Sequence, residues 1–116
     1  MYRQFRYASI LVVLLTSGVL ALAEIRVANG DAMKAATKKT QPDYPPIARQ
    51  LKIMGRVEVD VTIDAEGNVE NVKIVSGNAM LTQSVVSAVK KWKFAPFMQD
   101  GAATKAVAAL EFDFKM

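Results

Sequence analysis

The stretch RVEVDVTIDAEGN, residues 56–68, decides the fold of this chain. From residue 56 to residue 64, apolar and polar side chains alternate without a break, which is the period of a β-strand with one buried face. The Glu-Gly-Asn that follows indicates a turn, because glycine and asparagine tolerate a positive φ. A second strand, Val69 to Ser76, is therefore expected to return as a hairpin, with Val72 and Ile74 facing inward.

A short helix is expected before this hairpin. Pro45 and Pro46 predict its start, because proline is favoured at the first helical position. Ile47 and Leu51 are four residues apart, so we expect them on one face of this helix. Gly55 marks its end.

A longer helix and a last strand are expected after the hairpin. An apolar stripe at helical spacing predicts a helix from Leu81 to Lys91, with Asn78 or Thr82 as its N-cap. Strict alternation predicts a strand from Lys105 to Lys115. The order helix, strand, strand, helix, strand predicts an α+β fold, a two-layer sandwich of two helices on a three-stranded antiparallel sheet.

The N-terminal residues 1–23 have the pattern of a secretory signal. Arg3 and Arg6 precede a run of 16 residues that is apolar except for Thr-Ser-Gly, and the run ends in Ala-Leu-Ala. This pattern predicts export with cleavage before Glu24. The alternative is a short membrane anchor, although a spanning helix needs about 20 apolar residues.

The rest of the chain divides into two parts. Residues 24–40 are polar, without a clear period, and are expected to form a leader or linker in which Asp31 to Lys38 could make a short helix. Residues 41–116 are expected to form the folded domain.

The composition excludes several kinds of function. The formal charge of +4 falls to +2 without Arg3 and Arg6. A charge this small does not indicate a nucleic-acid partner. The chain has no cysteine and no histidine, so it has no thiol nucleophile, imidazole base, or metal site built on those side chains. Asp60, Asp64 and Glu66 are explained by a solvated strand face and a turn. We therefore expect no enzyme, no cofactor and no metal.

Several short motifs, taken in order, resemble the C-terminal domain of TonB-family energy transducers. The resemblance covers about residues 41–116, and no single motif would carry it alone. The motifs are Gln41-Pro42-x-Tyr44-Pro45, Gly55-x-Val57-x-Val59, Asp64-x-x-Gly67-x-Val69, Val72-x-Ile74-x-Ser76, Trp92-Lys93-Phe94-x-Pro96 and Phe112-x-Phe114.

The resemblance implies a periplasmic binding domain that supports energised transport across the outer membrane. Its implied partner is the N-terminal box peptide of an outer-membrane receptor, which would add as a strand beside the last strand of the domain. The uncharged Val107 and Ala109 suggest that this edge is open in its first half. The expected partner-binding residues are Gln41, Tyr44, Lys105, Ala106, Val107, Ala108, Ala109, Leu110 and Glu111.

Two departures from the family pattern leave an alternative open. Typical transducers carry an anchor with a histidine that meets an inner-membrane motor complex, followed by a long proline-rich spacer. This chain has no histidine, and its linker is short and without proline. The alternative is a free periplasmic adaptor of the same fold without energy coupling. The motor complex is an expected partner only if the N-terminus is uncleaved, and a homodimer through the last strand is a further alternative.

Overall fold

The computed structural model describes residues 24–116, so the secretory signal expected in residues 1–23 lies outside the described residues. The elements, in chain order, are β1 (Ile25–Val27), α2 (Asn29–Ala35), β2 (Ala36–Lys38), α3 (Pro46–Gln50), β3 (Gly55–Ile63), β4 (Val69–Ser76), α4 (Ala79–Val89), β5 (Lys93–Phe94), β6 (Phe97–Gln99), β7 (Ala102–Thr104) and β8 (Ala106–Phe114).

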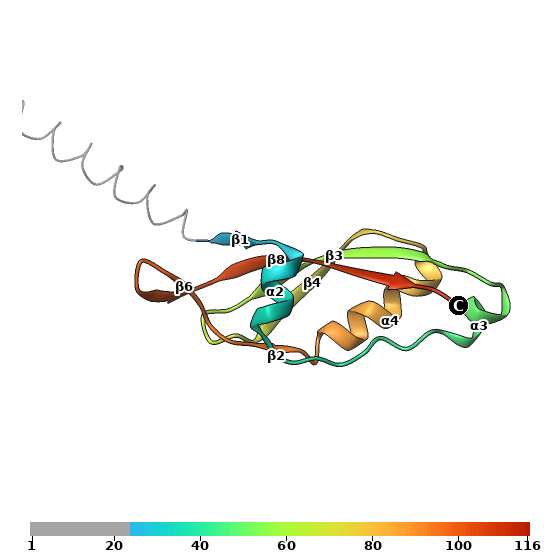
Figure 1. The fold of residues 1–116 in the computed structure, drawn as a ribbon, viewed down its shortest axis with the longest axis horizontal. Coiled ribbons are helices and arrows are strands. Elements are labelled where there is room, and N and C mark those ends of the chain that lie inside the picture. Colours follow the sequence, from blue (N-terminus) through green and yellow to red (C-terminus); the bar gives the residue numbers. More distant parts are fainter. Residues whose placement is uncertain (1–23) are drawn as a thin grey trace, which may run out of the picture.

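The main sheet has four strands in the order β1-β8-β3-β4 (Figure 1). β3 is antiparallel to both of its neighbours, and its register with β8 runs from Gly55 opposite Phe114 to Ile63 opposite Ala106. These three strands are the expected antiparallel sheet. β1 adds a fourth strand, parallel to the start of β8.

Helices α2 and α4 pack on the sheet, which confirms the expected α+β class. The apolar side chains of β3 alternate inward as expected, and all four are at most 1% exposed. Asn78 is the N-cap of α4, because its Oδ1 accepts a hydrogen bond from the Met80 N–H at 2.8 Å. The core consists of Ala32, Ala48, Val57, Val59, Val61, Ile63, Leu81, Val85, Val89, Trp92, Phe94, Ala108, Leu110 and Phe114.

The segment that was expected to be a leader is folded in this structure. It forms β1, α2 and β2, and it places Ala32 in the core with no exposed surface. β2 pairs with β5, and the Ala95 N–H donates to the Ala35 carbonyl at 2.8 Å. The folded part of the described chain therefore begins at β1.

Three apolar side chains of the expected elements remain largely exposed. Ile47 and Leu51 are 50% and 57% exposed, because α3 is a single turn that turns the small Ala48 toward the core. Ile74 is on the inward face as expected, opposite the buried Val59, but it remains 45% exposed because β4 is the outer strand of the sheet.

The β3–β4 turn is fixed by hydrogen bonds to one carboxylate. Asp64 Oδ1 accepts from the backbone N–H groups of Glu66 and Asn68, both at 2.9 Å. These bonds, that of Asn68 above all, lower the pKa of Asp64 below its ordinary value of 3.8, although desolvation opposes them. The Gly67 carbonyl accepts from the Phe94 N–H at 2.9 Å, so the turn also holds β5.

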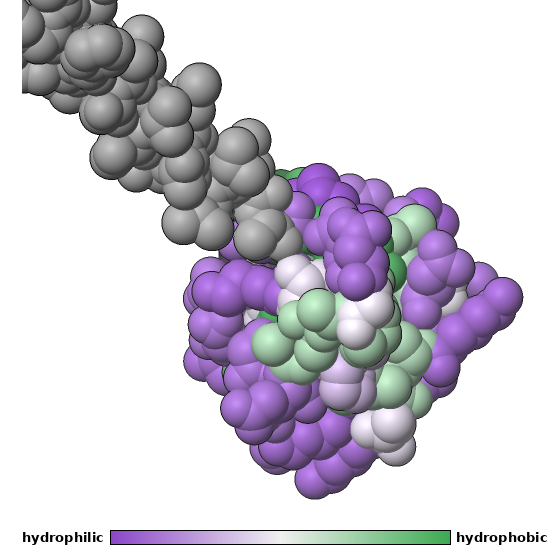
Figure 2. Space-filling model, turned by 90° about the vertical axis from the view of Figure 1, so that its left-hand side faces the viewer, coloured by the Kyte–Doolittle hydropathy of each residue, from purple (hydrophilic) through white to green (hydrophobic). Residues whose placement is uncertain are grey.

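A hairpin of β6 and β7 forms one end of the molecule (Figure 1). Met98 in this hairpin is 59% exposed. Seen from this end, a patch of hydrophobic surface is bordered by hydrophilic surface (Figure 2). In residues 24–116, no helix has the length and hydrophobicity that crossing a membrane requires.

Candidate peptide-binding groove

Strand β8 has one fully paired edge and one edge that is paired only in part. Along its whole length it pairs with β3, whereas β1 covers the other edge only at residues 106–108. Farther along this second edge, the Glu111 N–H donates to Asn29 Oδ1 at 3.1 Å. Alternate residues of an antiparallel strand direct their backbone groups to the same edge. Asp113 therefore directs its N–H and C=O to this edge, and no group of residues 24–116 pairs with them.

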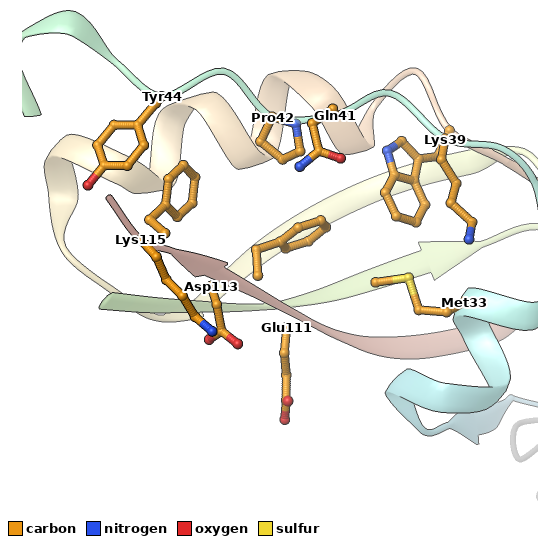
Figure 3. Close-up of a pocket in the computed structure, with 11 residues that line it drawn as sticks. Met33, Lys39, Gln41, Pro42, Tyr44, Glu111, Asp113 and Lys115 are labelled. Carbon is orange, nitrogen blue, oxygen red and sulfur yellow. The ribbon is translucent and has the colours of Figure 1, made fainter. Parts of the chain in front are cut away.

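A groove of about 490 Å³ lies between this edge and the chain segment 39–44. Figure 3 shows Lys39, Gln41, Pro42 and Tyr44 along one wall, with Met33 of α2 at one end and β8 along the other wall. The lining residues are Met33, Lys39, Gln41, Pro42, Tyr44, Trp92, Glu111, Phe112, Asp113, Phe114 and Lys115.

Aromatic contacts attach segment 39–44 to the sheet. Trp92 packs edge-on against Phe112 with ring centroids 5.7 Å apart, and its Nε1–H donates to the Thr40 carbonyl at 2.9 Å. Tyr44 packs edge-on against Phe114 at 5.4 Å. Because both walls of the groove are held by the same aromatic layer, the groove is formed before any partner binds.

Tyr44 has further contacts that hold it in place. Its hydroxyl donates to the Ile53 carbonyl, which fixes the chain that follows α3. The Arg49 guanidinium lies 4.7 Å from the centroid of the Tyr44 ring. Tyr44 is therefore both a structural residue and a lining residue of the groove.

The charged side chains of β8 do not fill the groove. Glu111 and Asp113 point away from segment 39–44 (Figure 3). Arg56 on β3 pairs with both, at 3.6 Å and 3.0 Å, and the hydrogen bond with Asp113 is the main cause of a raised pKa of Arg56. Lys39 also lines the groove, whereas the Lys115 side chain runs beside Asp113, away from segment 39–44 (Figure 3).

Only some of the expected site residues line the groove. Gln41, Tyr44 and Glu111 line one groove, although they come from distant parts of the sequence. The expectation of an edge open in its first half is wrong for the described chain, because β1 pairs there. The four residues under β1 or beside it are Lys105, Ala106, Val107 and Ala108.

Ala109 and Leu110, the other two expected site residues, lie between the part of β8 that β1 covers and the part that lines the groove. Ala109 follows the part covered by β1, and Leu110 is fully buried on the inner face of the sheet. Sequence reasoning missed Asp113, Lys115, Lys39 and Met33 as lining residues. The alternation of β8 could have shown that Asp113 faces the same edge as Glu111; nothing local indicated Met33.

In residues 24–116, no three acidic, cysteine or histidine side chains come together in a way that could hold a metal ion. The carboxylate of Asp64 accepts hydrogen bonds from the turn backbone.

Comparisons with known proteins agree with this architecture. The family model described as the Gram-negative bacterial TonB protein C-terminal matches residues 40–116. The chain is 34% identical over 88 residues to Protein TonB of Vibrio cholerae, across 74% of this chain and 36% of that protein. It is 39% identical over 61 residues to Protein TonB of Salmonella typhimurium, across 51% of this chain and 25% of that protein.

A solved structure supports the same conclusion. The solution NMR structure of the Pseudomonas aeruginosa TonB CTD is similar with a TM-score of 0.59 and 29% identity, over 70% of this chain and 84% of that one. The matched part covers only 25–36% of the length of the two curated relatives named above. Since the family model matches more than half of the residues, the chain belongs to the family of the Gram-negative bacterial TonB protein C-terminal domain.

Proposed function

We propose that this domain binds the N-terminal box peptide of an outer-membrane receptor by β-strand addition along residues 111–115, in the periplasm. Through that contact it takes a TonB-like part in energy-coupled transport across the outer membrane. The proposal rests above all on the unpaired backbone of Asp113, which lies beside a preformed groove.

Strand addition suits the chemistry of this edge. The added strand forms main-chain hydrogen bonds with β8, and these depend little on the peptide sequence. Alternate side chains of the peptide then face the groove, where Phe112 and Phe114 offer apolar contact and Gln41 offers an amide.

The proposed function is binding rather than catalysis. If the chain is anchored, a proton-driven inner-membrane motor complex could apply a shearing force to the partner through the strand pairing along β8. The family membership and the groove beside β8 both support this role.

One observation favours the alternative of a free periplasmic adaptor without energy coupling. Residues 25–38 are packed on the domain instead of extended, so they add little reach. Recovery of the protein from cells distinguishes the two functions: an intact Met1 supports coupling, whereas a chain that starts at Glu24 supports the adaptor.

Two substitutions at one position test strand addition. Asp113→Pro removes the outward N–H and places a ring against the partner strand, while the ladder to β3 keeps its bonds because the N–H faces outward. Asp113→Ala is the matched control, because it removes the ion pair with Arg56 but keeps the N–H.

The expected result is a clear difference between these variants. One lost hydrogen bond is worth about 1 kcal/mol, and the steric block adds to it, so Asp113→Pro should weaken binding of a receptor box peptide by about ten-fold or more. Asp113→Ala should weaken it by less than about three-fold, since exposed ion pairs contribute little. Equal affinity of the proline variant and the wild type, measured by calorimetry, would rule out strand addition at this edge.

A further inference from the structure

Strand β1 already uses part of the edge that the proposed partner needs. Ile25, Arg26 and Val27 lie opposite Ala106, Val107 and Ala108 in a parallel register. The Ile25 N–H donates to the Lys105 carbonyl at 3.3 Å. β1 is thus an internal strand added to β8, in the position that an external peptide would take (Figure 1).

Asn29 extends this ladder by one step with its side chain. If the register continued, residue 29 would lie opposite Leu110, and its backbone carbonyl would accept from the Glu111 N–H. The chain instead enters α2 at Asn29, and the side-chain Oδ1 accepts from that N–H at 3.1 Å. The side-chain amide therefore replaces the carbonyl that an edge strand would have supplied.

The two parts of this segment are held with different strength. α2 is anchored by Ala32, which is fully buried in the core. β1 has only three paired residues, and its ion pair between Arg26 and Asp60, 3.3 Å long, is exposed and contributes little. Asn29 stands at the junction, at the point where the covered edge meets the open one.

We infer that β1 and Asn29 together set the length and register of the partner strand, with Asn29 as the positioning residue that ends it at Glu111. This inference rests on the proposed function. A partner strand that follows the edge from Lys115 meets the Glu111 carbonyl and both backbone groups of Asp113. The next group along the edge is the Glu111 N–H, which already donates to Asn29 Oδ1.

A pair of variants in the full chain tests the role of Asn29. Asn29→Ala removes the acceptor, whereas Asn29→Asp keeps an oxygen at the same place and serves as the matched control. In the free protein, the Glu111 amide should exchange with solvent at least about five-fold faster in the alanine variant, and at the wild-type rate in the aspartate variant. Unchanged exchange in the alanine variant would overturn the inference.

Peptide length provides the functional measurement. The probes are a five-residue receptor box peptide and two nine-residue versions that extend it at one end or the other. Asn29→Ala should bind one of the longer peptides about five-fold tighter than the wild type, the gain from one more hydrogen bond. Asn29→Asp should bind all three as the wild type does. Wild-type affinity of the alanine variant for all three peptides would overturn the inference alone, whereas no binding by any form would overturn the proposed function and the inference with it.

A disulfide tests whether β1 stays in place when the partner binds. The chain has no cysteine, so Arg26→Cys with Val107→Cys, at directly opposed positions, gives a single possible bridge. The oxidised protein should bind the five-residue peptide within about two-fold of the reduced protein. Loss of binding on oxidation would show that the partner must displace β1, and would overturn the inference.

Discussion

Replacement of Gly67 by alanine should destabilise the domain strongly, because there is no room for one methyl group. An alanine Cβ at this position lies 1.9 Å from the Phe94 carbonyl oxygen and 2.9 Å from its carbon. Both contacts are to backbone, so no side chain can rotate away. The turn and β5 must separate by about 1.5 Å to restore an ordinary contact, which breaks the hydrogen bond from the Phe94 N–H to the Gly67 carbonyl.

The cost has two parts of similar size. Gly67 has a φ of 92°, and a side chain in the left-handed region costs about 1–2 kcal/mol. The lost hydrogen bond costs about 1 kcal/mol more. The sum, about 2–3 kcal/mol of unfolding free energy, lowers the melting temperature of a domain of this size by about 8–24 °C.

Urea unfolding followed by circular dichroism measures this loss, and a second glycine gives the control. Gly101 has a φ of 81° but has nothing within 4 Å of a built Cβ. Gly101→Ala therefore measures the backbone strain alone, about 1–2 kcal/mol. If the two variants lose the same free energy within about 0.5 kcal/mol, the contact between the turn and β5 does not exist as described.

Three further predictions concern the groove wall and the turn. Tyr44→Phe removes the donor to the Ile53 carbonyl and should cost about 1 kcal/mol in urea unfolding; a neutral result would contradict that bond. Trp92→Phe leaves the Thr40 carbonyl without its donor and should cost about 1–3 kcal/mol while also weakening peptide binding, whereas unchanged affinity would show that the wall needs no anchor. Because the folded-state pKa of Asp64 is lowered, its carboxylate stabilises the fold above the ordinary value of 3.8, and this stabilisation is lost as the pH falls through the folded-state pKa. The difference in unfolding free energy between the wild type and Asp64→Asn should therefore shrink below about pH 4, and a constant difference down to pH 2 would contradict the assignment.

The elements with a long, regular period were predictable from the sequence. β4 spans Val69–Ser76 as expected, and α4 begins and ends two residues earlier than the expected helix. In these segments the repeat of apolar side chains matches the face that is buried, so local pattern and tertiary packing agree. The turn at Gly67 was also predictable, because its positive φ favours glycine.

The short elements depend on partners that are distant in the sequence. β1 has three residues, and it is a strand only because Ala106 and its neighbours offer an unpaired edge about 80 residues later. α3 is a single turn, so the pair Ile47 and Leu51 could not reveal that Ala48 faces the core. In such segments tertiary contacts override the local signal.

The candidate site was predictable in part. Family resemblance placed Gln41 and Tyr44 beside the last strand. In the structure both residues line one groove together with β8. Which half of the edge is open depends on β1 and Asn29, and side-chain charge gave the wrong half. The uncharged Val107 lies opposite Arg26 of β1, whereas the charged Glu111 and Asp113 pair with Arg56 and leave the edge accessible.

Amide hydrogen exchange at Asp113 tests the central claim most directly. With a saturating receptor box peptide, a strand added along residues 111–115 should slow exchange of the Asp113 N–H by at least about ten-fold, because that group gains a hydrogen bond. The N–H groups of β4, on the opposite edge of the sheet, should exchange at their original rates. Unchanged exchange at Asp113, or slowing on β4 instead, would contradict the account.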